Sequence, residues 1–182
     1  MKKKKHIRPK PRTRPDWDSF YLAQAFIASS RSIDPNTQHG CIIVSKDNRI
    51  LSSACNGPLR GVDDDKIPMN RPDKYSFIIH AEENAIIFYS GSNKDIEGGT
   101  AYVTGRPCHK CLRMLMQKGI SRVVYSDMET VCVDSHDLMI QESFLDLKND
   151  KNFSMELYPY KSKIKSVIED RLSYLIERVK DE

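Results

Sequence analysis

The pattern of apolar and polar positions predicts an alternation of helices and strands. Between Trp17 and Ala28 the apolar residues recur every three or four positions, as on one face of a helix. Asp16 can cap the start of this helix, and Pro35 must follow its end. The elements expected in chain order are a helix over 17–31, strands over 41–45 and 49–54 joined as a hairpin, a helix over 80–89, a strand over 100–104, a helix over 108–118 and a strand over 122–125.

Two parts of the chain have a weaker pattern. Residues 56–74 combine glycines, prolines and three consecutive aspartates, which predicts a long irregular loop, and such loops in compact domains are usually functional. Near the C-terminus, residues 153–158 are compatible with another strand. Apolar residues from Ile164 to Val179 recur at helical spacing and predict a long amphipathic helix. Its apolar stripe either closes the core or contacts another subunit.

Length and element order together favour one α/β domain. Helices and strands in this order favour a sheet covered by helices over a helical bundle. The chain has 182 residues, enough for one domain with a sizeable core, which we expect over 16–182. No apolar run approaches the ~20 residues that span a bilayer, and the N-terminus lacks the apolar segment of a secretory signal. We therefore expect a cytoplasmic protein.

Charge is distributed unevenly along the chain. Eight of the 29 lysines and arginines precede Asp16, the first acidic residue. They lie within 1–15 beside three prolines and no apolar periodicity, so we expect a flexible basic arm there. The remainder has 21 basic against 25 acidic residues, a balance of −4. The arm is suited to bind phosphate, nucleic acid or a nuclear import receptor, but a solvated tail is the simpler interpretation.

Candidate chemistry is concentrated in two short motifs. His80-Ala81-Glu82 is followed, after one expected strand, by Pro107-Cys108-His109-Lys110-Cys111. Two cysteines three positions apart at a helix start place both sulfurs on one turn, where the helix dipole favours thiolates. His80 supplies a third ligand. This ordered pair of motifs is the known signature of zinc-dependent base deaminases. The cysteines are five in number, which disfavours a disulfide framework.

The number of ligands distinguishes a catalytic zinc site from a structural one. Three protein ligands leave a fourth position for water, whose pKa zinc can lower to ~7. Deamination then needs a group that carries the proton to the ring nitrogen and to the leaving ammonia, and Glu82 is the candidate. Residues two apart do not share a face of a regular helix, so His80 must lie at the first turn. A closed structural site needs a fourth ligand, for which His109, Cys132 and His136 are the candidates.

Further segments resemble the deoxycytidylate (dCMP) deaminase family. The resemblance spans roughly Arg14 to Tyr125 and rests on Arg14-Pro15-Asp16-Trp17-Asp18, Asp34-Pro35-Asn36-Thr37-Gln38, Asn56-Gly57, and Arg71-Pro72-Asp73-Lys74-Tyr75 leading into the His80 motif. It implies a cytidine-deaminase-like three-layer αβα sandwich, with a mixed central sheet and helices on both faces. It also implies conversion of dCMP to dUMP for thymidylate supply, a homo-oligomer that is often a hexamer, and regulation by dCTP and dTTP with Mg²⁺.

The same resemblance implies roles for residues outside the zinc motif. Asn56 should bond the 3′-hydroxyl of the deoxyribose, whereas Arg14, Asn36 and Thr37 lie where the 5′-phosphate is received. Effector contacts would come from the long loop, through Gly61, Asp63 and Asp64. The chain departs from the family at Ala54-Cys55, where Gly-Tyr is usual, and at His39, where a small apolar residue is common.

Three other functions stay open at this point. The first is a deaminase that edits tRNA or single-stranded DNA, with the basic arm adding electrostatic affinity. The acidic body, which lacks a basic stripe with interleaved aromatics, disfavours nucleic acid as a partner. The second is a free-nucleoside or pterin deaminase. The third is a non-catalytic module with a structural zinc, which would have no use for Glu82.

Overall fold

The computed structural model describes residues 13–127, 134–147, 153–170 and 173. At its centre is a five-stranded mixed sheet with the strand order β2-β1-β5-β6-β7. β1 runs antiparallel to both β2 and β5, whereas β5, β6 and β7 are parallel to one another. The strands are β1 (Gly40–Val44), β2 (Ile50–Cys55), β5 (Thr100–Val103), β6 (Arg122–Ser126) and β7 (Ser154–Tyr158).

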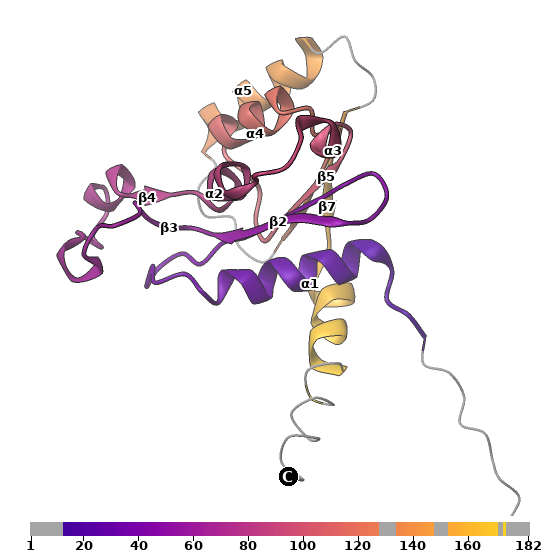
Figure 1. Ribbon diagram of the computed structural model, residues 1–182, viewed down its shortest axis with the longest axis horizontal. Helices are drawn as coiled ribbons and strands as arrows, with labels where there is room; N and C mark the ends of the chain where they lie inside the picture. The colour runs from indigo at the N-terminus through magenta and orange to yellow at the C-terminus, as the bar shows by residue number, and fades with distance from the viewer. Residues whose placement is uncertain (1–12, 128–133, 148–152, 171–172, 174–182) are drawn as a thin grey trace, which may run out of the picture.

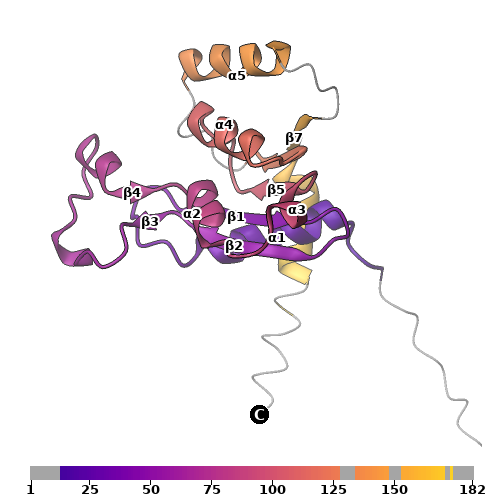
Figure 2. The same ribbon diagram turned by 45° about the horizontal axis from the view of Figure 1, so that its top comes forward.

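Helices cover both faces of this sheet (Figure 1). One face carries α1 (Trp17–Ser29) and the helical residues 160–170. The opposite face carries α2 (Ala81–Phe88), α3 (Asn93–Ile96) and α4 (His109–Gln117), with α5 (Ser135–Leu147) packed outside α4 (Figure 2). The expected three-layer αβα sandwich is therefore confirmed.

The central strand β1 contributes to the hydrophobic core on both sides. Cys41 and Ile43 belong to the cluster under α2 and α4, whereas Ile42 belongs to the cluster under α1. All five residues of β1 are buried, as expected for a strand covered on both faces. At its first position, a Cβ on Gly40 would lie 1.9 Å from the carbonyl oxygen of Ala25. Only glycine there lets α1 pack this closely against the sheet.

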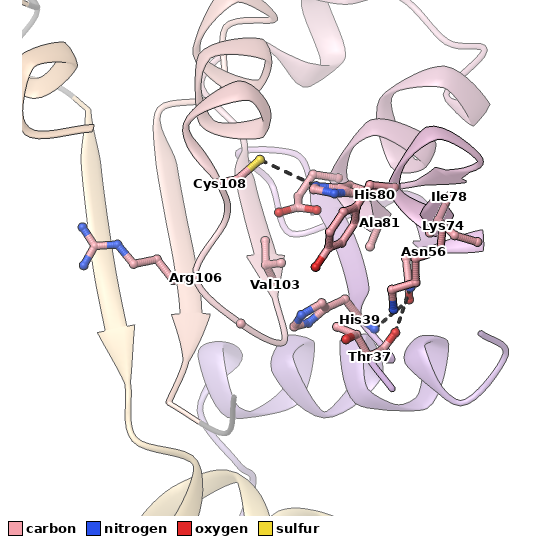
Figure 3. Close-up of a pocket in the computed structure, with 13 residues that line it drawn as sticks. Thr37, His39, Asn56, Lys74, Ile78, His80, Ala81, Val103, Arg106 and Cys108 are labelled. Carbon is pink, nitrogen blue, oxygen red and sulfur yellow. Dashed lines mark hydrogen bonds between the residues drawn. The ribbon is translucent and has the colours of Figure 1, made fainter. Parts of the chain in front are cut away.

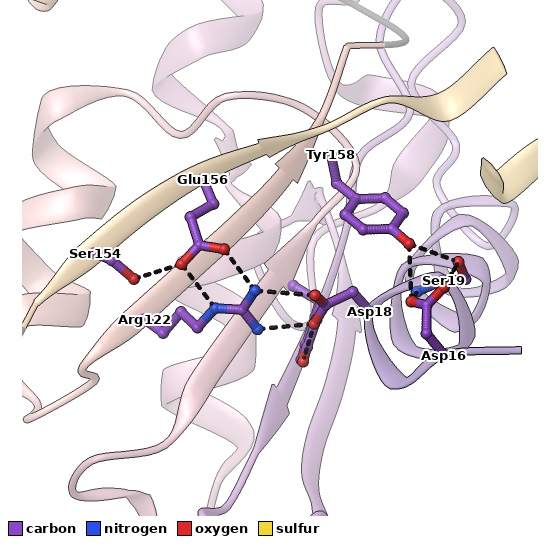
Figure 4. A network of polar contacts seen from close by, with 8 residues as sticks. Asp16, Asp18, Ser19, Arg122, Ser154, Glu156 and Tyr158 are labelled. Atoms are coloured by element: carbon purple, nitrogen blue, oxygen red, sulfur yellow. Dashed lines mark hydrogen bonds and ion pairs between the residues drawn. The ribbon is translucent and has the colours of Figure 1, made fainter. Parts of the chain in front are cut away.

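A polar network ties α1 to the last two strands (Figure 4). Arg122 on β6 donates to both carboxylate oxygens of Asp18 at 2.8 and 2.9 Å, and to Glu156 on β7 at 3.0 and 2.6 Å. Next to it, the Tyr158 hydroxyl donates to Asp16 at 2.8 Å. A pair of parallel hydrogen bonds between an arginine and a carboxylate fixes the relative orientation of the two side chains and also stabilises the fold. The network therefore orients segments that are far apart in the sequence.

The structure differs from the expected elements in several places. α1 ends at Ser29, α3 was not predicted, and α5 forms where the sequence pattern gave no helix. A parallel connection between β6 and β7 requires a crossover, and α5 lies within it. The expected irregular loop contains short elements, namely β3 (Gly57–Pro58), which pairs with β4 (Ile78–Ile79), and 3-10 turns over Asp64–Lys66 and Asp73–Ser76.

Two sequence-based expectations fall largely outside the described residues. These are the basic arm, whose residues 1–12 are not described, and the C-terminal helix beyond residue 170 apart from residue 173. The helical residues up to 170 agree with the expected position of that helix. Within the described part of the chain, no helix has the length and apolar character needed to cross a membrane.

Candidate active site

The N-termini of α2 and α4 lie next to each other and supply the residues of the two sequence motifs. His80 is the N-cap residue of α2 and Cys108 is the N-cap residue of α4, and both have an extended backbone. Cys111 follows in the first turn of α4. Residues two apart within a helix lie on different faces. Because His80 precedes the first helical turn, this restriction does not apply, and His80 and Glu82 can face the same site. The positive ends of both helix dipoles meet here and favour negative charge.

The donor atoms of His80, Cys108 and Cys111 fit a zinc ion. One ligand atom from each residue lies within 4.8 Å of the other two. The Nδ1 of His80 is 3.6 Å from the Sγ of Cys108 and 3.3 Å from the Sγ of Cys111. A tetrahedral zinc ion with ordinary bond lengths would hold a nitrogen and a sulfur ligand about 3.6 Å apart. Little rearrangement is therefore needed for these three atoms to bind zinc.

Hydrogen bonds within this cluster couple the pKa values of His80, Cys108 and Cys111. A hydrogen bond from the Cys111 thiol lowers the pKa of Cys108 to about 4, and the bond to Cys108 raises the pKa of His80 to about 9. The pKa of Cys111 is raised by its bond to Cys108 and by burial. One thiolate thus forms readily, whereas a second beside it meets repulsion. A divalent cation is what allows both thiols to ionise.

Glu82 lines a pocket together with His80 and Cys108. Its side chain is 5% exposed, and burial raises the pKa of the carboxyl, while the charge of His80 opposes the shift. A raised pKa makes a buried carboxyl a better proton acceptor, which suits a general acid–base group. The other residues that line the pocket are Thr37, His39, Asn56, Lys74, Tyr75, Ile78, His80, Ala81, Val103, Gly105, Arg106 and Cys108.

The opposite wall of the pocket is built by the loop between α1 and β1. Asn56 holds this loop, because its Nδ2 donates to the carbonyl of Thr37 at 2.9 Å and its Oδ1 accepts from the amide of His39 at 2.8 Å. A carboxamide has two N–H donors and two lone pairs on its oxygen. One donor and one lone pair of Asn56 therefore remain for a ligand. The Nδ1 of His39 lies 3.0 Å from the hydroxyl of Thr104.

Two cations from the segment before α2 reach the same loop. The Nη2 of Arg71 donates to the Thr37 hydroxyl at 3.0 Å. Lys74 is 2% exposed, and its ammonium bonds both oxygens of Asp34 at 2.9 and 2.6 Å. Burial alone would raise the pKa of Asp34, but Lys74 and two backbone amides hold it below its ordinary value. Lys74 is thus neutralised by its partner, whereas Arg71 donates to a neutral hydroxyl.

Sequence reasoning assigned no role to several residues in or next to this pocket. Lys74, Tyr75 and Arg106 line the pocket, and Arg71 lies next to it through its bond to Thr37. The available signal was their position in the segments that lead into the two metal-ligand motifs. The Arg106 side chain points away from the other labelled residues and bonds Gln141 at 3.0 Å (Figure 3).

Other predicted site residues lie away from the pocket. Arg14 lines an apolar groove on α1 together with Trp17 and Phe20. Asn36 is exposed, and its amide donates to the Met69 carbonyl at 3.5 Å. The structure therefore brings Thr37 and Asn56 to the zinc motif, whereas neither Arg14 nor Asn36 lines the pocket.

The residues assigned to effector binding lie on the exposed segment between β3 and β4. Asp63 caps the turn over Asp64–Lys66 and pairs with Lys66 at 2.9 Å, and Gly61 has a positive φ of 82°. None of Gly61, Asp63 and Asp64 lines the pocket. A solvated turn forms such local contacts without a ligand, so they do not by themselves indicate an effector site.

The candidates for a fourth zinc ligand do not complete the cluster. His109 turns outward and pairs with Asp137 on α5. His136 is exposed and is not part of the cluster found among the described residues, and Cys132 lies outside them. Three protein ligands are therefore available in the part of the chain that the structure describes.

An αβα sandwich with one histidine and two cysteines at converging helix N-termini, beside a buried glutamate, is typical of zinc-dependent base deaminases. The family described as "Cytidine and deoxycytidylate deaminase zinc-binding region" matches residues 15–127. The chain belongs to this family, and zinc is accordingly its metal.

Comparison with individual proteins gives the same result. The chain is 35% identical to human "Deoxycytidylate deaminase" over 60% of this chain and 64% of that one, so the match spans less than two thirds of the human protein. It is 33% identical to "Deoxycytidylate deaminase" of Mycobacterium phage D29, over 62% of this chain and 96% of that one. The crystal structure of dCMP deaminase from cyanophage S-TIM5 in complex with dCMP and dUMP superposes with a TM-score of 0.64 at 22% identity, covering 81% of this chain and 100% of that one. That structure supports the fold.

Proposed function

We propose that this protein hydrolyses dCMP to dUMP and ammonia, with zinc held by His80, Cys108 and Cys111. The observation that carries the proposal is the placement of His80, Cys108 and Glu82 in one pocket, with Cys111 completing the group of three donor atoms that lie within 4.8 Å of one another. The curated relatives named deoxycytidylate deaminase support dCMP as the substrate. The product dUMP suits thymidylate supply.

Glu82 is the residue proposed to move protons in this reaction. When bound, zinc supplies Lewis-acid chemistry and an acidified water. In the net reaction water adds at C4 of the cytosine ring and the amino group leaves as ammonia. The buried carboxyl of Glu82 carries the two protons of the water in turn, the first to the ring nitrogen and the second to the amino group that leaves as ammonia. Its raised pKa suits a group that must both accept and donate.

The opposite wall suits the sugar and phosphate of a nucleotide. Asn56 has a free donor and acceptor for the 3′-hydroxyl, as its bonds to the loop leave one of each. For the 5′-phosphate we propose Thr37 and Arg71 in place of Arg14 and Asn36. The guanidinium of Arg71 lies 3.0 Å from the Thr37 hydroxyl, so both groups can reach one anion.

An ammonia-release assay with purified protein tests the substrate. It compares dCMP, dCTP, deoxycytidine, cytidine and a short single-stranded oligonucleotide, with zinc content measured in parallel. We expect dCMP to have by far the largest kcat/KM. Comparable turnover of the oligonucleotide that disappears when residues 1–13 are deleted would instead support the editing deaminase. Bound zinc without turnover of any substrate would support the structural module.

Replacing Arg71 with glutamine should raise KM for dCMP by about 10- to 100-fold, because a hydrogen bond between charged groups contributes roughly 1.5–3 kcal/mol. Deoxycytidine has no phosphate, so its kcat/KM should stay unchanged. Arg60→Gln is the matched control, since Arg60 is exposed on the same segment, whereas Arg71 bonds Thr37 of the pocket wall. Equal losses for dCMP and deoxycytidine would show that Arg71 does not bind the phosphate.

Other expectations from the family resemblance stay predictions. Regulation by dCTP and dTTP with Mg²⁺ through Gly61, Asp63 and Asp64 is tested by repeating the dCMP assay with each effector. A homo-oligomer, such as a hexamer, is tested by light scattering during size-exclusion chromatography. A cytoplasmic location and a flexible basic arm at 1–15, which rest on the composition of the chain and not on the resemblance, also stay predictions.

A further inference from the structure

Helix α5 holds the loop that carries the first cysteine of the proposed zinc site. It lies outside residues 15–127, which match the family, and its sequence gave no sign of a role in catalysis. In the fold it packs against α4, whose N-cap is Cys108 (Figure 2). Two of its side chains, Asp137 and Gln141, reach the segment on either side of that cysteine.

Asp137 binds the residue that follows Cys108. The backbone amide of His109 donates to the Asp137 carboxylate at 2.9 Å, and the His109 imidazole pairs with the same carboxylate. Asp137 is itself fixed, because its own amide donates to Asp134 at 2.8 Å. The His109 amide belongs to the first turn of α4, whose N–H groups have no partner within the helix. Asp137 therefore caps α4 from another helix.

Gln141 binds the two residues that precede Cys108. Its side chain is completely buried, its Nε2 donates to the carbonyl of Pro107 at 2.9 Å, and its Oε1 accepts from the Nε of Arg106 at 3.0 Å. Arg106 is fixed further by its guanidinium lying 5.6 Å from the centre of the Tyr125 ring. A buried carboxamide is costly unless it is hydrogen-bonded. Here both ends of the carboxamide are bonded to the cysteine loop.

These contacts fix the backbone on both sides of Cys108. The separations from the His80 nitrogen to the two sulfurs, 3.6 and 3.3 Å, fit zinc only while the loop keeps this position. An N-cap residue lacks the hydrogen bonding of the helix interior, so its backbone needs support from outside. Groups that orient metal ligands in this way typically change metal affinity 10- to 100-fold when they are removed.

We propose that Asp137 and Gln141 are positioning residues, which hold Cys108 in the geometry that zinc requires. The inference rests on the proposed zinc site and adds a part of the chain beyond the deaminase motifs. It makes the affinity for zinc depend on a helix that does not contact the metal. It also gives a role to His109, which binds α5 instead of the metal.

Zinc binding by the full-length chain tests this proposal. Gln141→Leu removes both bonds to the loop while keeping a similar volume, and Asp137→Ala removes the cap. We expect both variants to bind zinc about 10- to 100-fold more weakly in competition with a chromophoric chelator. The cobalt(II)-substituted proteins should show a shifted d–d absorption spectrum. The matched controls are Glu142→Gln and Asp146→Asn, which change exposed side chains of α5 and should preserve both readouts.

Conservative variants and kinetics separate positioning from general stability. Asp137→Asn keeps an oxygen acceptor for the His109 amide and should retain more zinc affinity than Asp137→Ala, even if Gln141→Leu fails to fold. In zinc-saturated Asp137→Ala, kcat for dCMP should fall while KM stays constant, because the wall made by Asn56 and Arg71 is unchanged. Wild-type zinc affinity and cobalt spectrum in folded Asp137→Ala or Gln141→Leu would overturn the proposal. If the wild-type chain bound no zinc, the proposed function itself would fail.

Discussion

Glu82→Gln should lower kcat for dCMP by roughly 10²- to 10⁴-fold, the usual contribution of a positioned general acid–base group. The amide has nearly the same size and cannot take up and return a proton. Zinc content should stay at the wild-type level, because Glu82 is not one of the three donors. Metal analysis and an ammonia-release assay on the same preparation measure both quantities.

Glu83→Gln is the matched control for this experiment. It makes the same change of charge on the same helix, but Glu83 lines the neighbouring groove and not the pocket. Most of the turnover should therefore survive. A Glu82→Gln protein that keeps wild-type turnover would contradict the assigned role. Loss of zinc together with turnover would show instead that Glu82 supports the metal site.

Lys74→Met should lower the free energy of unfolding by about 3–5 kcal/mol, because breaking a buried ion pair leaves an uncompensated charge. Both side chains of the Lys74–Asp34 pair are only 2% exposed. Since Asp34 also accepts from the amides of Asn36 and Thr37, the loss should disturb the pocket wall. Denaturant unfolding at neutral pH measures the change.

Two further variants and a pH series make this result specific. Lys66→Met breaks the exposed pair with Asp63 and should cost no more than about 1 kcal/mol. Adding Asp34→Asn to Lys74→Met removes the isolated charge and should restore part of the stability. Because the folded-state pKa of Asp34 is lowered, the stability that the pair contributes is present above the ordinary pKa and is lost as pH falls through the folded-state value. A Lys74→Met cost equal to that of Lys66→Met would refute the argument.

Local sequence patterns determined the strands and the main helices of the sandwich. β1, β2, β5 and β6 form within about one residue of the predicted runs, because each is a short apolar run bounded by turn residues. The spacing within Cys108-His109-Lys110-Cys111 likewise determined that two sulfurs lie on one turn. These features depend on residues that are close together in the chain. The spacing of apolar residues and of cysteines along the sequence is therefore enough to predict them.

Only the tertiary structure decided which distant residues meet at the site. The family resemblance implied Arg14 for the phosphate, but Arg14 precedes α1 and lines an apolar groove there, whereas Arg71 reaches Thr37 from a segment 34 residues away. Likewise α5 has no strong apolar periodicity, and its position follows from the parallel pairing of β6 with β7. The sequence by itself therefore determined the chemistry of the zinc motif. The packing of distant elements decided what surrounds that motif, because contacts between residues far apart in the chain leave no local periodicity to detect.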